Sequence, residues 1–158
     1  MSFELSSAAF KHNERIPKEY TGEGKDTSPP LAWRDAPPGT QAFALICDDP
    51  DAPMGTWVHW VIWNIPGSRT SLPAGVPRGK EVKDLDGARQ GANSWKTDNI
   101  GYRGPMPPPG HGPHRYNFAI YALNQKLDLA AGATKKDLIN TMAGHILGEA
   151  RLTGKYER

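Results

Sequence analysis

The stretch DDPDAPMGTWVHW at residues 48–60 places three carboxylates within four positions and a histidine between two tryptophans shortly afterwards. A carboxylate beside a histidine can orient the imidazole or share its proton, and it raises the pKa of the ring. Asp and Pro also build ordinary solvated turns, so this stretch becomes a site only if a partner converges on it. The candidate chemistry is proton sharing in which Asp49 or Asp51 supports His59.

The candidate partner is the segment GPMPPPGHGPHRY at residues 104–116, where four of residues 104–109 are proline and glycines flank them. Proline removes amide donors and fixes φ, whereas glycine lets the backbone approach a ligand closely. His114 and Tyr116 follow at a spacing of two, so they share one face if the segment enters a strand directly. Imidazolium and phenol groups donate well to the oxygens of an anion. Together the two segments predict an anion site; the alternative is two unrelated turns, with His59 filling a core position.

Three segments with strand character must position these groups, namely residues 41–48, 57–64 and 116–123. In the second segment, Trp57 and His59 lie on one face of the strand, and both faces are rich in apolar side chains. We therefore expect a central strand that is covered on both sides. Such a strand suits a sandwich, or a sheet with a helix on its back.

A long connection, residues 87–112, leads into the third strand. Connections of this length in a compact domain are usually functional or disordered. Trp95, Ile100 and Tyr102 give this one side chains that can pack. We therefore expect an ordered loop.

One helix is predicted near the C-terminus, over residues 135–150, where apolar residues recur at helical spacing. Thr134 is the candidate N-cap, and Asp137 stands at the third helical position of an imperfect capping box. Strands followed by a single late helix indicate a mainly β protein with a helical C-terminal cover. Residues 1–158 are predicted to form one domain.

Composition narrows the class of partner. The formal charge of +2 at pH 7, without long blocks of like charge, does not support strong binding to nucleic acid or to a membrane surface. Cys47 is the only cysteine, which excludes an internal disulfide, fits a reducing compartment and predicts a buried, inert thiol. No secretory signal is visible, and the sequence has no run of about 18 apolar residues. We expect a cytoplasmic protein without membrane insertion.

Several motifs in order resemble the phosphatidylethanolamine-binding protein family, also called Raf kinase inhibitor protein-like. They are DPDAP at 49–53, GPMPP at 104–108 and HRY at 114–116. SPPLAW at 28–33, followed by PPGT at 37–40, is similar to the family's entry into its first core strand. The short MGT link before the His59 strand resembles the bacterial and archaeal branch.

The resemblance implies an antiparallel Greek-key β-sandwich with a C-terminal α-helix and small peripheral helices. It also implies a pocket for a phosphate-like anion or phospholipid headgroup, without a cofactor, and a cis peptide bond before Pro53. A homodimer is common in this branch. Met106 stands where members of the branch often have a cysteine, which changes the size of the pocket wall. The ligand-binding residues that the resemblance implies are Asp49, Asp51, Pro53, Trp57, His59, Pro107, Pro108, Gly110, His114 and Tyr116.

Three functions compete. The favoured one is binding of a small anion, with a regulatory or inhibitor role toward a kinase or protease that the family name implies. The second is a hydrolase that uses an Asp–His pair; there is no GxSxG motif, and Ser94 could be proposed as the nucleophile although nothing in the sequence places it near His59. The third is a metal site, built from the H-x-x-H pair of His111 and His114 or from His59, His114 and Asp49. A zinc-protease motif needs such a pair on a helix, and here it stands in a Pro/Gly loop.

Overall fold

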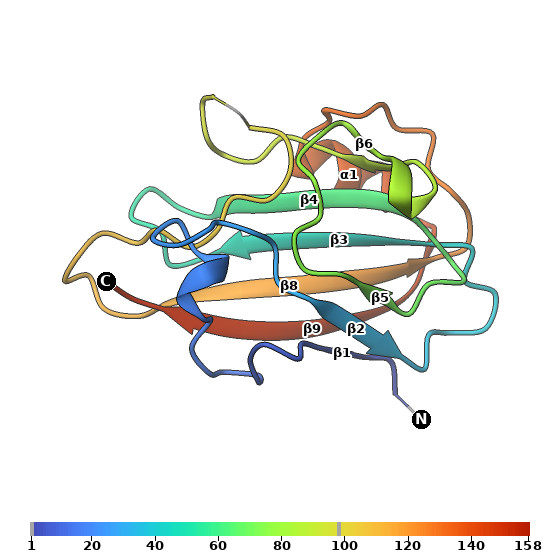
Figure 1. Cartoon of the computed structure of the whole chain (residues 1–158). Coiled ribbons are helices and arrows are strands. Elements are labelled where there is room, and N and C mark those ends of the chain that lie inside the picture. The colour runs from blue at the N-terminus through green and yellow to red at the C-terminus, as the bar shows by residue number, and fades with distance from the viewer. Residues whose placement is uncertain (1, 98) are drawn as a thin grey trace.

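The computed structural model describes residues 2–97 and 99–158, and within them the chain forms two antiparallel sheets, one α-helix and two short 3-10 helices (Figure 1). The strands are β1 (Glu4–Ser6), β2 (Leu31–Arg34), β3 (Ala42–Asp49), β4 (Trp57–Pro66), β5 (Ser71–Leu72), β6 (Glu81–Val82), β7 (Ala88–Gln90), β8 (His114–Leu123) and β9 (Ile146–Tyr156). The helices are η1 (Lys18–Tyr20), η2 (Lys83–Leu85) and α1 (Lys135–Met142). One sheet has the order β6-β7-β4-β3-β8-β9, and the other has the order β1-β2-β5.

The three predicted strands form the centre of the larger sheet, where β3 pairs with β4 on one side and with β8 on the other. Trp60 and Ile62 of β4 face the smaller sheet, in a core that includes Trp33. Val61 and Trp63 face the opposite side. Figure 1 shows the smaller sheet on one face of the larger sheet and α1 on the other. The expected mainly β sandwich, with a central strand covered on both faces, is confirmed.

The predicted helix over residues 135–150 is wrong in its second half. The capping box between Thr134 and Asp137 is present, but α1 ends at Met142 and Gly144 then adopts a φ of 83°. The chain continues as β9, which pairs with β8 along almost its whole length. Strand pairing outweighed the helical spacing of the apolar residues, because β9 supplies hydrogen-bond partners to the backbone groups on the outer edge of β8.

Short strands β2, β5 and β7 lie outside the three segments that the sequence predicted as strands. They have two to four residues, too few to show an alternating pattern. The long connection is ordered around Tyr102, which is buried and whose hydroxyl donates to the Tyr20 carbonyl at 2.6 Å. Residue 98 of this connection lies outside the described residues.

The peptide bond before Pro53 is trans, as are the other peptide bonds in the described part of the chain, so the implied cis bond is wrong. The local hydrogen bonding gives the reason. The Gly55 N–H donates to the Ala52 carbonyl at 3.1 Å, which closes a four-residue turn with Pro53 in its second position. Trans proline is favoured there, whereas the turn type that requires cis proline has it one position later.

Candidate functional site

A pocket of about 290 Å³ opens where β3 ends and where β4 and β8 begin. Antiparallel pairing brings these ends together, since Asp49 is opposite Trp57 and Asp48 is opposite Asn117. The two segments singled out in the sequence therefore converge, and His59 is part of the convergence. The lining residues are Asp49, Ala52, Pro53, Met54, Trp57, His59, Trp95, Met106, Pro107, Pro108, His114 and Tyr116.

Eight of the ten expected ligand residues line this pocket, and the exceptions are Asp51 and Gly110. The Asp51 carboxylate is engaged outside, where Arg115 donates to it from Nε at 3.0 Å and from Nη2 at 2.8 Å. These hydrogen bonds lower the pKa of Asp51 to about 2. The Gly110 N–H donates to the Arg158 carbonyl at 3.1 Å. Asp51 and Gly110 thus shape the neighbouring loops rather than the pocket surface.

Three of the lining residues, Ala52, Met54 and Trp95, were not expected at the site, and Met106 was expected only as part of the pocket wall. Trp95 was expected only to pack within its loop. Its ring lies edge-on to Trp57 at 5.5 Å and to His59 at 5.0 Å between centroids. A tryptophan in a long ordered loop signals packing in general, and nothing in the sequence says against which strand.

Asp49 and His114 form a buried pair, with 3% and 2% of their surfaces exposed. His114 Nδ1–H donates to Asp49 Oδ2 at 2.7 Å, and the Asp51 N–H donates to Asp49 Oδ1 at 2.7 Å. His114 Nε2 lies 2.6 Å from Nδ1 of His111, so one proton bridges the two rings. Both nitrogens of His114 are therefore occupied within the protein, and the charge of Asp49 is largely met by donors.

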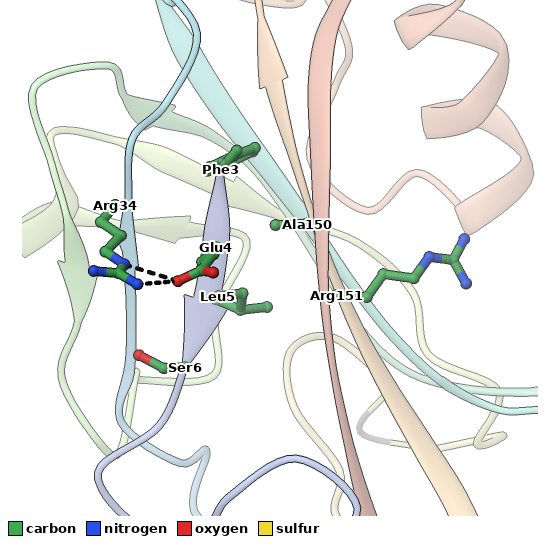
Figure 2. A pocket seen from close by; sticks show the side chains of 7 residues that line it. All are labelled: Phe3, Glu4, Leu5, Ser6, Arg34, Ala150 and Arg151. Carbon is green, nitrogen blue, oxygen red and sulfur yellow. Dashed lines mark hydrogen bonds and ion pairs between the residues drawn. The ribbon is translucent and has the colours of Figure 1, made fainter. Parts of the chain in front are cut away.

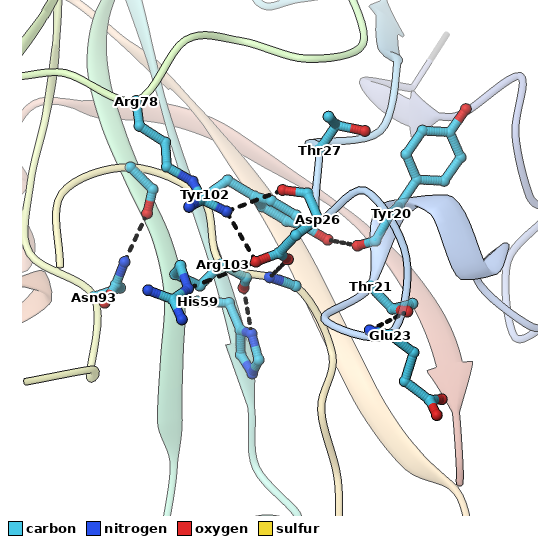
Figure 3. Close-up of polar contacts among 12 residues, drawn as sticks. Tyr20, Thr21, Glu23, Asp26, Thr27, His59, Arg78, Asn93, Tyr102 and Arg103 are labelled. Atoms are coloured by element: carbon cyan, nitrogen blue, oxygen red, sulfur yellow. Dashed lines mark hydrogen bonds and ion pairs between the residues drawn. The ribbon is translucent and has the colours of Figure 1, made fainter. Parts of the chain in front are cut away.

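His59 is held differently. Its Nδ1–H donates to the Arg103 carbonyl at 2.6 Å (Figure 3), and burial lowers its pKa from 6.5 to about 4. The ring is neutral at pH 7 and presents an unprotonated Nε2, because a carbonyl oxygen can only accept. The expectation that nearby carboxylates raise the pKa of this histidine is wrong, since desolvation outweighs their attraction.

Tyr116 supplies a donor. Its side chain is buried, and burial together with Asp49 raises the pKa of the phenol, which keeps it protonated. The hydroxyl lies near the Asp49 carboxylate, which contributes to this rise through its charge and through a side-chain hydrogen bond. Its ring meets His59 edge-on, with centroids 5.1 Å apart. The pocket thus offers a hydroxyl donor and an imidazole acceptor within a mostly apolar lining.

The other predicted chemistries lack their groups in the described residues. The Cys47 thiol is buried, and burial raises its pKa well above the ordinary value. Ser94 Oγ accepts the Val58 N–H at 2.8 Å and has no bond to His59. No cluster of three or more His, Cys, Asp or Glu side chains with metal-binding geometry occurs among residues 2–97 and 99–158.

A larger hollow of about 400 Å³ lies elsewhere, between β1 and the edge of β9 (Figure 2). Leu5 and Ala150 point into it, and Arg34 is paired with Glu4 at its rim. None of the predicted site residues lines it. Paired charges along exposed strands are a common protection of sheet edges, so we assign this hollow no ligand.

Comparisons with known proteins agree with this geometry. The sequence model of the family described as phosphatidylethanolamine-binding protein matches residues 6–157. A protein of Methanothermobacter thermautotrophicus, called a UPF0098 protein, is 49% identical over 98% of both chains. The crystal structure of YbcL from Escherichia coli, described as a member of the mammalian PEBP family, has a TM-score of 0.89 at 32% identity and covers 100% of this chain and 99% of its own.

A second solved structure is similar to the same extent. It is a putative phosphatidylethanolamine-binding protein homologue from Chlamydia trachomatis, with a TM-score of 0.87 at 36% identity over 99% of this chain and 98% of its own. In the residues that the structure describes, no helix is long and apolar enough to cross a membrane.

Proposed function

Because the chain belongs to the phosphatidylethanolamine-binding protein family, we propose that its pocket binds a small phosphate-like anion, either free or as a phosphorylated headgroup. The observation that carries the proposal is the hydroxyl of Tyr116 beside the unprotonated Nε2 of His59 in the pocket at the end of the sheet. These two groups give an oxyanion one donor and one acceptor. The volume of about 290 Å³ suits a small ligand.

The apolar lining supports an anion that carries a small apolar substituent. Pro107 and Pro108 form one wall, and Trp57 and Trp95 form another. A proline wall has no amide hydrogens of its own, so polar contacts are concentrated at the imidazole and hydroxyl groups. Apolar surroundings strengthen each of these hydrogen bonds. Binding, rather than hydrolysis, is the function that this set of groups favours.

Calorimetric titration with inorganic phosphate at pH 6 tests the proposal. Tyr116→Phe should weaken phosphate binding about fivefold, the effect of one net hydrogen bond. Tyr121→Phe is the matched control, because Tyr121 lies on the same strand but packs in the core on the opposite face of the sheet. Equal losses in the two variants, or no phosphate binding by the native protein, would contradict the proposal.

A regulatory or inhibitory role toward a protein partner is a second part of the proposal. Met54, 93% exposed, and Met106, 44% exposed, stand among the pocket residues, so a partner docked over them would contact both protein and ligand. Pull-downs with immobilised protein, with and without phosphate, would test this. A kinase or protease retained equally by the native protein and by a Met54→Lys variant would contradict docking at the pocket.

A further inference from the structure

Asp26 and His59 hold the two ends of one peptide group (Figure 3). The peptide joins Arg103 to Gly104. Its N–H, from Gly104, donates to Asp26 Oδ1 at 2.6 Å, and its carbonyl, from Arg103, accepts the Nδ1–H of His59 at 2.6 Å. A carboxylate at one end of an amide polarises it and strengthens the bond at the other end. Asp26 therefore acts on the imidazole through the peptide.

The Asp26 carboxylate is itself fixed. Arg78 Nη2 donates to Asp26 Oδ2 at 2.8 Å and to its carbonyl at 3.0 Å, and Arg103 Nε lies 3.6 Å from Oδ2. Asp26 has a φ of 57°, a left-handed conformation that Asp and Asn adopt more readily than most residues. Gly104 fits closely, since a Cβ there would lie 2.3 Å from the Tyr20 carbonyl oxygen. The peptide has little freedom to rotate.

The fixed carbonyl determines what His59 offers the pocket. The Arg103 N–H also donates to the His59 backbone carbonyl at 3.0 Å, so the residue is held from two sides. The titratable and charged groups around the ring are Asp48 and Asp49 from β3, Tyr116 from β8, and Arg103 with Asp26 from the loops. With the proton held on Nδ1, the pocket-facing nitrogen is an acceptor.

We infer that Asp26 is a positioning residue that presents His59 as an acceptor through the Arg103–Gly104 peptide, so that the pocket selects a singly protonated phosphomonoester over an oxyanion without a proton. The inference rests on the proposed anion pocket. In this ligand the P–OH donates to His59 Nε2, and an unprotonated oxygen accepts from the Tyr116 hydroxyl. A fully ionised oxyanion places a second acceptor against Nε2, and two acceptors without a proton repel. The chemistry is shared by a free phosphomonoester and by the headgroup of phosphatidic acid.

Methyl phosphate and methyl sulfate test this selection in the native protein. At pH 5 both carry one negative charge and have a similar shape, but only methyl phosphate carries a proton, because its second pKa is about 6. We expect methyl phosphate to bind about tenfold more tightly, or better, and its affinity to fall above about pH 6 while that of methyl sulfate changes little.

Each outcome is decisive. Equal affinity of the two ligands at pH 5 would overturn the acceptor role of His59 and leave the anion pocket standing. Binding of neither ligand would overturn the inference together with the proposed function. Once methyl phosphate is preferred, dihexanoyl phosphatidic acid assigns the source. Much tighter binding than methyl phosphate indicates a lipid headgroup, and similar binding indicates a free phosphomonoester.

Variants of Asp26 test the positioning role. Asp26→Ala should make the affinities for methyl phosphate and methyl sulfate nearly equal. It should also let Nε2 of His59 acquire a proton, which ¹⁵N NMR of the ring reports directly. Asp26→Asn should keep most of the preference, because its amide oxygen can still accept the Gly104 N–H. Asp86→Asn is the matched control, since Asp86 is exposed and has a similar φ of 53°.

An unchanged preference and ring spectrum in Asp26→Ala would overturn the positioning role. If Asp26→Ala does not fold, the native spectrum decides. His59 with a protonated Nε2 at pH 6 would contradict the inference, and an unprotonated Nε2 that persists in Asp26→Asn would support it.

Discussion

Replacing His59 by Asn should change how the stability of the protein depends on pH. His59 is 3% exposed, and burial lowers its pKa from 6.5 to about 4. The unfolded chain therefore binds a proton at this ring below about pH 6.5, whereas the folded protein binds it only below about pH 4. Stability that is present above pH 6.5 is lost as the pH falls toward 4. Asn does not titrate, and its amide can still donate to the Arg103 carbonyl.

The size of the effect follows from the two pKa values. At about 1.4 kcal/mol per pKa unit, a fall from 6.5 to about 4 corresponds to about 3 kcal/mol. At pH 7 the native protein should be the more stable, because His59→Asn leaves a small cavity. Between pH 7 and 4 the native protein should lose about 3 kcal/mol of unfolding free energy relative to the variant. Near pH 4 the native protein should therefore have lost most of the greater stability that it has at pH 7.

Urea unfolding followed by tryptophan fluorescence measures this difference, since Trp60 and Trp63 are fully buried. Subtracting the curves removes the contribution of the carboxylates, which titrate in both proteins. His59→Gln should give the same pH slope with a different offset at pH 7. A difference in unfolding free energy that stays constant from pH 7 to 4 would refute the neutral, buried imidazole.

Three further perturbations test other parts of the structure. Asp51→Asn should destabilise the protein by about 0.5–1 kcal/mol at pH 7, a value reduced for solvent screening because the Arg115 side chain is 56% exposed. Since the pKa of Asp51 is lowered to about 2, this loss of stability should disappear as the pH falls from about 4 to 2. Urea unfolding at each pH would measure it. Thr134→Ala should cost about 1 kcal/mol by thermal unfolding, through loss of the capping box, and should leave phosphate affinity unchanged. Gly104→Ala should weaken phosphate binding at least tenfold by calorimetry, because its Cβ would lie 2.3 Å from the Tyr20 carbonyl oxygen and displace the Arg103 peptide. Native affinity in this variant would show that the segment around Gly104 adjusts freely.

The convergence at the pocket was predictable because it follows from strand order. DPDAP ends one strong strand and HRY begins another, and in antiparallel pairing the end of one strand meets the beginnings of its neighbours. Tyr116 was identified because a period of two places it on the same face of its strand as His114. For His59 the period of two was wrong, since it places the ring on the face of Val61 and Trp63. A register shift between the Cys47–Trp60 and Asp48–Val58 pairs brings His59 to the face of Tyr116 instead. The family motifs then supplied the order in which these segments occur.

Other features depend on partners far away in the chain. The helical spacing at residues 146–150 gave no sign that β8 needed an edge partner, so β9 was missed. Asp51 has the same residue type as Asp49, and only the position of Arg115 sends it outward. Asp26 accepts the N–H of Gly104, which lies 78 positions later in the chain, and the segment around Asp26 carries no catalytic motif.

The protonation of His59 shows the same limit. The sequence places carboxylates near the ring, which favours a raised pKa, but it does not give the burial that outweighs them. Burial depends on Trp95 and Tyr116, which reach the ring from other segments. The sign of a pKa change at such a position is set by tertiary packing.

The most direct test of the proposed function is a crystal structure of the protein with methyl phosphate at pH 5. The phosphoryl group is predicted to lie in the pocket at the ends of β3, β4 and β8, with one oxygen within hydrogen-bonding distance of the Tyr116 hydroxyl and another within that distance of His59 Nε2. A phosphoryl group in the hollow between β1 and β9, or in the pocket without contact to either side chain, would contradict the account.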